Sequence, residues 1–285
     1  MSTCAEWWHL AEAWSSDYCV VLYDRAGYGR STMSTRPRTL DDIAVEAFTL
    51  LDCLNITEPV VVVGHSMGGL YAQKYALAFP KRVCGLVLLD PVCANNAELA
   101  CLLTPREYRA GGVDKSRNLI WGRRLCALGL GFALRPLLAK APPFHYKSDF
   151  TAEAREYILG NLTHARAYRV ALAEYAVLKC ERDLAVLSTS EGFPPIPIEL
   201  VLSDPDTIIR ETRHYGGADW ATATKVQQIW HRMMRGYLSL SLESRETVTQ
   251  RGSHYLHLTA AAEVKQAIDD INVSWSGWPG RSAAP

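Results

Sequence analysis

Residues 60–71 of this 285-residue chain read VVVVGHSMGGLY, and this stretch decides the fold class. Four consecutive valines are typical of a strand that is buried on both faces of a parallel sheet. Gly64, Ser66 and Gly68 then form a G-x-S-x-G pattern, and the alanine-rich run of residues 70–77 predicts a helix. Glycines on either side of the serine allow strand and helix to approach closely, so that the serine hydroxyl stays exposed on a sharp turn. The stretch therefore predicts that Ser66 lies exposed on a sharp turn between a strand and a helix.

Strand and helix patterns alternate on both sides of this turn. Further strands are predicted at residues 18–23, 83–89, 198–202 and 247–250, the last one short and polar, as an edge strand can be. Helices are predicted at residues 5–16, 40–54, 220–240 and 260–271, and a capping box at residues 39–42 opens the second of them. This alternation indicates an α/β protein with a mostly parallel sheet and flanking helices.

The alternation is interrupted between about residues 92 and 195. Helices alone are predicted there, at residues 105–110, 118–140, 151–160 and 165–187, before a proline-rich run returns the chain to the sheet. We therefore expect an inserted helical segment between the two parts of the sheet.

Three motifs in this arrangement resemble the α/β-hydrolase family, in its serine-nucleophile branch. They are the G-x-S-x-G of residues 64–68, the D-x-x-G-x-G-x-S loop of residues 24–31, which we interpret as structural, and the HYLHL run of residues 254–258. The resemblance implies the α/β-hydrolase fold, with a core at residues 1–91 and 196–273. It also implies a helical cap at residues 92–195, and residues 274–285 are expected to form a flexible tail.

A serine hydroxyl becomes a strong nucleophile when a histidine accepts its proton and a carboxylate holds that histidine in position. The resemblance implies Ser66 as the nucleophile and His254 as the base, because His254 occupies the family's position after the last strand. The family's usual glycine before this histidine is replaced by Ser253. His257 is the alternative base, although its motif position favours a structural role.

The acid of the triad has three candidates. Asp206 comes first, because it aligns with the family's aspartate after the strand at residues 198–202. Asp204 comes second, because a following proline biases its backbone away from a tight turn. Asp90, at the end of the strand at residues 83–89, comes third, because some relatives place the acid there.

The oxyanion hole is expected to contain the backbone N–H of Met67. In the family a second donor comes from a loop after an earlier strand, usually marked by His-Gly. The resemblance begins at about Trp7, and the family's first three strands have no counterpart before it. We therefore expect this chain, as given, to be weakly active or inactive and poorly stable. One missing donor costs roughly a hundred- to a thousandfold in rate, and each buried backbone group left unpaired by a missing strand costs about 1–3 kcal/mol.

Two functions are compatible with these residues. The first is a serine esterase, or a hydrolase of thioesters or amides, that works through an acyl-enzyme; the alternative is a catalytically inactive truncated or ligand-binding member of the same fold. A small or medium apolar acyl ester is the expected substrate, because one part of the cap is rich in large apolar residues: Leu125, Leu128, Leu130, Phe132, Leu134, Leu137 and Leu138. Alternatively, these residues pack the cap onto the sheet.

Composition limits the possible partners and cofactors. Thirty basic and thirty acidic side chains cancel, which suggests neither nucleic acid nor an anionic membrane as a partner. The eight cysteines are scattered, with no zinc-type spacing, so we expect no metal and no cofactor. Neither a signal peptide nor a transmembrane segment is recognised, and a reduced, cytoplasmic protein is expected.

Overall fold

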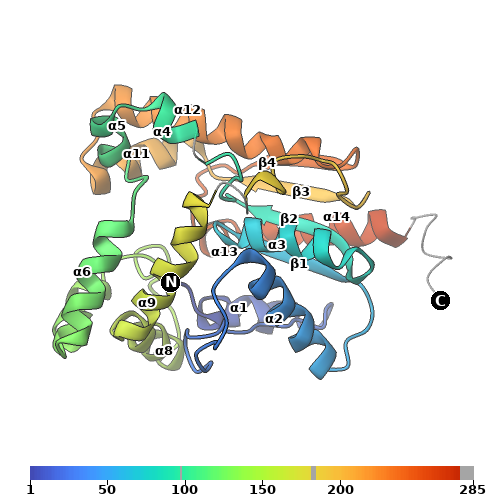
Figure 1. The fold of residues 1–285 in the computed structure, drawn as a ribbon, viewed down its shortest axis with the longest axis horizontal. Coiled ribbons are helices and arrows are strands. Elements are labelled where there is room, and N and C mark those ends of the chain that lie inside the picture. The colour runs from blue at the N-terminus through green and yellow to red at the C-terminus, as the bar shows by residue number, and fades with distance from the viewer. Residues whose placement is uncertain (97, 181–183, 277–285) are drawn as a thin grey trace. The chain divides into compact units, whose positions relative to one another are not determined.

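A computed structural model describes residues 1–96, 98–180 and 184–276 (Figure 1). The contacts divide the chain into two compact units. Unit 1 comprises residues 1–39, 114–177 and 257–259, and unit 2 comprises residues 40–113, 178–256 and 260–285. These boundaries differ from the expected ones, because residues 1–39 group with part of the expected cap, whereas residues 92–113 and 178–195 group with the sheet.

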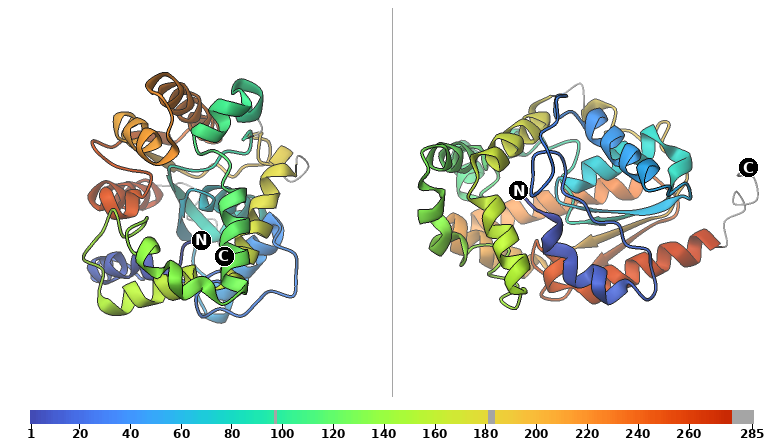
Figure 2. Two further views of the ribbon diagram at one scale, coloured as in Figure 1. Left: turned by 90° about the vertical axis from the view of Figure 1, so that its left-hand side faces the viewer. Right: turned by 90° about the horizontal axis from the view of Figure 1, so that it is seen from below.

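Unit 2 contains the sheet, which has four parallel strands in the order β1-β2-β3-β4. The strands are β1 (Val60–His65), β2 (Val83–Leu89), β3 (Ile198–Leu202) and β4 (Ser244–Val248). Helices α2 (Leu40–Cys53) and α3 (Gly68–Ala78) cover one face, and α14 (Ala261–Ser276) covers the other (Figure 2). The parallel sheet with flanking helices confirms the predicted fold class.

The remaining elements of unit 2 connect these layers. They are η2 (Pro80–Arg82), α4 (Glu98–Leu102), α5 (Pro105–Ala110), α11 (Pro205–Gly216), α12 (Trp220–Met234) and η5 (Arg235–Ser239). The sequence did not predict α11. Asp204 is the N-cap of this helix and accepts a hydrogen bond from the Thr207 N–H, while Pro205 occupies the first turn, where its missing N–H costs nothing.

The four valines of β1 correct one expectation. Residues 60–63 are only half-buried, whereas every residue of β2 and β3 is buried. The physical reason is position, since β1 is the outermost strand of the sheet formed by the described residues and pairs only with β2. The run of valines therefore predicted the strand correctly, but the prediction that both faces of this strand are buried was wrong.

The predicted strand at residues 18–23 is also wrong, because residues 18–25 form neither strand nor helix. Cys19 and Tyr23 are exposed in this segment. β-branched and aromatic residues favour an extended backbone, but a strand also needs a neighbour for its backbone N–H and C=O groups.

Unit 1 is mainly helical, with η1 (Cys4–Trp7), α1 (Trp8–Trp14), α6 (Ser116–Ala127), η3 (Leu130–Leu134), α7 (Arg135–Leu138), α8 (Ala152–Leu162) and α9 (Ala165–Ala176). Two short helices, η4 (Val177–Lys179) and α13 (Leu256–Thr259), lie at the unit boundaries. The single helix predicted at residues 118–140 is broken at Gly129, whose φ of 77° ends α6. The helix predicted at residues 165–187 is divided: α9 ends at Ala176, η4 ends at Lys179, residues 181–183 lie outside the described part of the chain, and residues 184–185 are again helical.

A buried ionic network organises unit 1. Glu174 accepts hydrogen bonds from Arg25 at 2.8 and 3.0 Å, from Arg38 at 3.2 Å and from the Tyr28 hydroxyl at 3.0 Å. Burial alone would raise the pKa of the Glu174 carboxyl, but the two guanidiniums and the hydroxyl outweigh burial and lower it to about 2. The network ties the loop of residues 24–31 to α9.

The same loop is held by Asp24, which is buried and accepts hydrogen bonds from the Cys4 N–H at 2.9 Å and from the Tyr157 hydroxyl. Gly29 has a φ of 49°, and a Cβ added there would lie 2.0 Å from an Asp24 oxygen. The glycine is therefore needed for the close approach of the Asp24 carboxylate to the backbone of residue 29. Of the expected tail, residues 274–276 belong to α14, and residues 277–285 lie outside the described part of the chain.

Candidate active site

Ser66 lies on the turn between β1 and α3, and its φ is 54°. A left-handed backbone is rare for a residue with a side chain, and it is stored strain that the surrounding structure must hold in place. Here the Ser66 N–H donates to the Leu89 carbonyl at 3.0 Å, and the Ser66 carbonyl accepts from the N–H groups of Gly69 and Val92 at 3.0 and 2.9 Å. The turn is thus fastened to the carboxyl end of β2.

The glycines around Ser66 have unequal roles. A Cβ on Gly64 would lie 2.4 Å from the Gly68 carbonyl oxygen, so that strand and helix could not approach as they do. A Cβ on Gly69 would lie 2.4 Å from the Cβ of Pro91, whereas a Cβ on Gly68 would meet no atom within 4 Å. Close packing therefore requires Gly64 and Gly69, and the second glycine of the G-x-S-x-G pattern is not sterically required.

Met67 follows the serine at the N-terminus of α3, with helical φ and ψ of −54° and −27°. Backbone N–H groups in the first turn of a helix have no acceptor within that helix, and the helix dipole makes this end favourable for negative charge. The Met67 N–H is therefore placed where an oxyanion donor is expected.

The carboxylate that meets His254 is Asp90, which the sequence ranked third. The Asp90 Oδ2 atom lies 3.0 Å from the His254 Nδ1 atom. The Oδ1 atom accepts hydrogen bonds from the Ser203 N–H at 2.9 Å and from the Ser203 hydroxyl at 3.0 Å. Burial would raise the pKa of Asp90, but the bond to His254, the charge of His254 and the two Ser203 bonds together lower it.

The two aspartates that the sequence ranked higher are engaged in α11 instead. Asp204 caps this helix, and its Oδ2 atom accepts from the Thr207 N–H at 3.2 Å and from the Thr207 hydroxyl at 2.6 Å. Asp206 is an exposed residue in the first turn of α11. Of the three candidate acids, the structure therefore brings Asp90 to His254, because the segment after β3 turns directly into a helix that engages Asp204.

His254 and His257 have different surroundings. The His254 side chain is 34% exposed, and its ring lies 4.8 Å from that of His65, whose Nε2 atom is 2.7 Å from the His254 carbonyl oxygen. His257 is fully buried in unit 1, where its ring stacks on Trp7 with centroids 4.2 Å apart. Of these two histidines, His254 has the solvent-accessible side chain.

A third histidine, His231 on α12, was missed by sequence reasoning. It is buried, and burial lowers its pKa, while the negative charge of Asp90 and a hydrogen bond to the Ser203 backbone act in the opposite direction. Nothing in the amphipathic pattern of α12 distinguishes this histidine from an ordinary core residue. Its proximity to Asp90 depends on how α12 packs.

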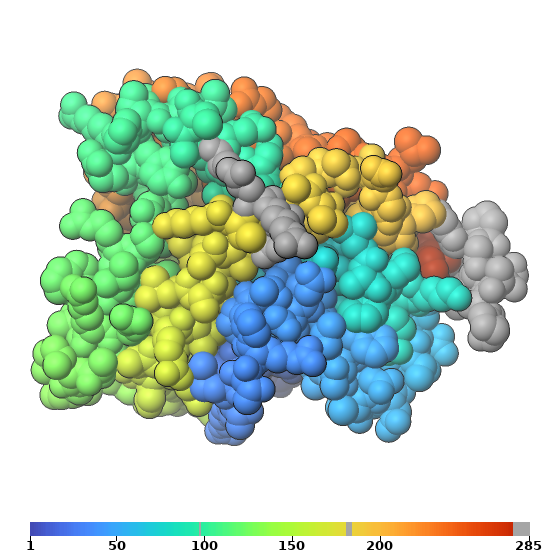
Figure 3. Space-filling view, viewed as in Figure 1, coloured from blue at the N-terminus to red at the C-terminus, as the bar shows by residue number. Residues whose placement is uncertain are grey.

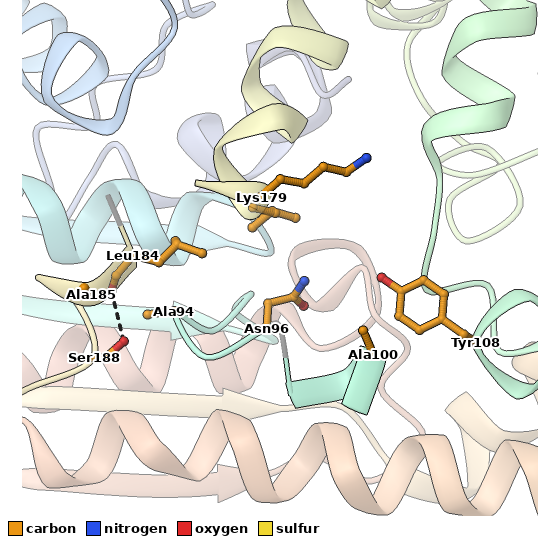
Figure 4. A pocket seen from close by; sticks show the side chains of 9 residues that line it. Ala94, Asn96, Ala100, Tyr108, Lys179, Leu184, Ala185 and Ser188 are labelled. Carbon is orange, nitrogen blue, oxygen red and sulfur yellow. Dashed lines mark hydrogen bonds between the residues drawn. The ribbon is translucent and has the colours of Figure 1, made fainter. Parts of the chain in front are cut away.

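A pocket of about 390 Å³ lies in unit 2 (Figure 4). Its wall residue Ala94 is two positions after Val92, whose N–H bonds the Ser66 carbonyl. On another side, the Gln73 side chain of α3 donates to the Leu187 carbonyl at 2.8 Å, next to the wall residue Ser188. The other lining residues are Asn96, Ala100, Tyr108, Leu178, Lys179, Leu184 and Ala185. Both walls are therefore attached to the segment that carries Ser66.

Across residues 1–96, 98–180 and 184–276, no group of three or more His, Cys, Asp or Glu side chains is arranged to hold a metal ion. In the same part of the chain, no helix has both the length and the apolar character needed to span a bilayer.

The sequence profile of the Alpha/beta hydrolase family matches residues 2–267, so this chain belongs to that family. Lipase LipV of Mycobacterium tuberculosis is 40% identical over 87 residues, which are 30% of this chain and 33% of that protein. The chain spans about a third of the length of the curated relatives it matches.

Solved structures agree on the fold. A thermophilic esterase from Thermogutta terrifontis has a TM-score of 0.59 at 18% identity, and the match covers 96% of this chain and 86% of that one. The enol-lactonase from Burkholderia xenovorans LB400 has a TM-score of 0.58 at 15% identity, over 95% and 87% of the two chains. At these identities the two structures show the fold that the chain shares with them.

Proposed function

We propose that this protein is a serine hydrolase that cleaves carboxylic esters through an acyl-enzyme, with Ser66 as nucleophile, His254 as base and Asp90 as the acid. The observation that carries the proposal is the 3.0 Å contact between Asp90 and His254, on the same unit as a serine with left-handed backbone. A buried carboxylate whose pKa is lowered stays ionised at neutral pH and holds the histidine with its Nδ1 atom protonated.

We propose the following chemistry for these three residues. His254 Nε2 removes the Ser66 hydroxyl proton while the serine oxygen attacks the acyl carbon, and the negative charge that develops on the carbonyl oxygen is stabilised by the Met67 N–H. The proton then passes to the departing alcohol as the ester bond breaks. Water repeats the sequence on the acyl-enzyme, releasing the acid and restoring Ser66.

The pocket supports small or medium acyl groups. Its volume of about 390 Å³ falls at the small end of ordinary ligand sites. Leu178, Leu184 and three alanines supply apolar surface, while Asn96 and Lys179 are polar (Figure 4). We expect p-nitrophenyl esters of short and medium acids to be cleaved faster than the palmitate, and a reversed preference would exclude this pocket as the acyl site.

A fluorophosphonate probe tests the proposed nucleophile, because it reacts covalently with activated serines. We expect the folded protein to be labelled at Ser66 and the Ser66→Ala variant not to be labelled. Ser239→Ala is the matched control, since Ser239 is an exposed residue whose hydroxyl bonds the Gly236 carbonyl. A folded protein that resists the probe and cleaves no ester would instead favour the non-catalytic alternative.

A further inference from the structure

An arginine-lined groove lies in unit 1, between α6 and α9. Its volume is about 540 Å³, and it is lined by Arg123, Arg124, Arg166 and Arg169 together with two alanines. The two helices run side by side in both the front view and the view from below (Figures 1 and 2). Four guanidiniums thus face one hollow that contains no acidic side chain.

These arginines are not used for ion pairing within the described part of the chain. None of the four forms a salt bridge there; Arg166 donates to the Gly29 carbonyl, and the Arg124 guanidinium lies 5.3 Å from the centre of the Trp121 ring. Elsewhere in unit 1 the arginines do find carboxylates, as Arg25 and Arg38 do on Glu174. Like charges gathered without counter-charges repel one another, so the groove is favourable for an anion.

The balance of charge over the whole chain conceals this concentration. Unit 1 contains fourteen basic and nine acidic side chains, whereas unit 2 contains sixteen basic and twenty-one acidic side chains. Within unit 1, residues 115–148 include seven lysines and arginines and no aspartate or glutamate. The net charge of the whole chain is therefore zero, but basic side chains are concentrated in unit 1 and acidic side chains in unit 2.

Large apolar side chains are exposed beside the groove. Trp121 is 55% exposed and Leu128 is 74% exposed, and both lie on the face of α6 that also holds Arg124, at i, i+3 and i+7. The next segment exposes Phe132 and Leu137, at 71% and 70%. Figure 3 shows this green part of the surface, from α6 to α7, open to the outside next to α9. Of the apolar residues that were expected either to contact substrate or to pack the cap, Leu128, Phe132 and Leu137 are mostly exposed, whereas Leu138 packs against a buried cluster of unit 1.

We propose that unit 1 binds the surface of a membrane that contains anionic phospholipids. The groove receives lipid phosphates, for which arginine is well suited because its guanidinium can donate two parallel hydrogen bonds. Trp121 and Leu128 enter the boundary between head groups and acyl chains, where arginine-rich surfaces with exposed tryptophan and leucine are typically found. A soluble phosphate compound would satisfy the arginines but would leave these apolar side chains in water, so the two features together favour a lipid surface.

Sedimentation with vesicles tests this proposal on the full chain. We expect the protein to bind vesicles in which about one third of the phosphatidylcholine is replaced by phosphatidylglycerol, and not to bind pure phosphatidylcholine. Binding should weaken strongly near 1 M salt, where the Debye length falls to about 3 Å. Neutralising two basic residues near such a surface should lower the partition coefficient about thirtyfold, so we expect this loss for Arg123→Gln with Arg169→Gln.

The matched control is Arg109→Gln with Arg232→Gln, which removes the same charge from exposed positions of unit 2. An equal loss in both double variants would mean that net charge, and not the groove, drives binding, and would overturn the proposal. Absence of binding to the anionic vesicles would overturn it as well. Calorimetric titration with inositol hexakisphosphate distinguishes a lipid phosphate from a soluble one. Tight binding of this soluble polyanion without vesicle binding would assign the groove to a soluble ligand.

Discussion

Replacing Asp90 with asparagine is the most informative single change in this protein. The side chain keeps its shape, and its amide oxygen can still accept from the Ser203 N–H and hydroxyl. The amide nitrogen, however, would face His254 Nδ1 with a donor where the carboxylate is an acceptor. The ring is then driven to the tautomer with a proton on Nε2, which cannot take a proton from Ser66. We expect kcat for an ester to fall about 10⁴-fold.

The same change affects stability in a pH-dependent way. Losing a charge-assisted hydrogen bond to a buried group costs about 1.5–3 kcal/mol. Because folding lowers the pKa of Asp90, its contribution is fully present above its unfolded pKa, near 3.9, and is lost as the pH falls through the lower folded value. The difference in free energy of unfolding between wild type and Asp90→Asn should therefore shrink below about pH 4.

Steady-state hydrolysis of p-nitrophenyl acetate and urea denaturation measure the two effects. Asp206→Asn is the matched control and should leave both activity and stability nearly unchanged, because Asp206 is exposed on α11. Asp204→Asn should also retain activity, since asparagine is about as good an N-cap as aspartate. If Asp90→Asn stays within tenfold of wild type while Asp206→Asn loses activity by a thousandfold, the assignment of the acid is refuted.

Three other predictions concern the turn, the base and unit 1. Gly64→Ala should lower the free energy of unfolding by about 1–3 kcal/mol or more, because the added Cβ would clash with the helix. Gly68→Ala should leave the stability unchanged or raise it. Thermal unfolding of the two variants measures the difference, and equal melting temperatures would contradict the steric argument. His254→Ala should abolish ester hydrolysis, whereas His257→Ala should cost about 1–3 kcal/mol of stability yet keep the folded enzyme within about tenfold of normal kcat. Glu174→Gln should cost about 3–5 kcal/mol near neutral pH, by leaving buried guanidiniums uncompensated. With a folded pKa of about 2, that cost should decline as the pH falls from about 4.5 toward 2, and a pH-independent cost in urea titrations would argue against the network.

The sequence was informative wherever a local pattern is sufficient. The strand, the glycines and the helix around Ser66 are contiguous, so steric rules for a strand-to-helix turn apply directly to residues 60–78. Helices opened by capping residues and ended by glycine or proline were found for similar reasons. The strand predicted at residues 18–23 was wrong, because pairing in a sheet is decided by a neighbouring strand that the segment itself does not encode.

The sequence by itself thus determined the family and the strand-to-helix turn that contains Ser66, and it predicted His254 as the base. Only the tertiary structure decided which carboxylate meets that histidine. Asp90 and His254 are 164 residues apart, and their contact depends on the order of the parallel strands and on α11 engaging Asp204. The arginine groove has the same origin, because α6 and α9 each contribute two arginines that have no significance until the helices pack together. Patterns along the chain encode local backbone geometry, whereas the meeting of charges from distant segments is a property of packing.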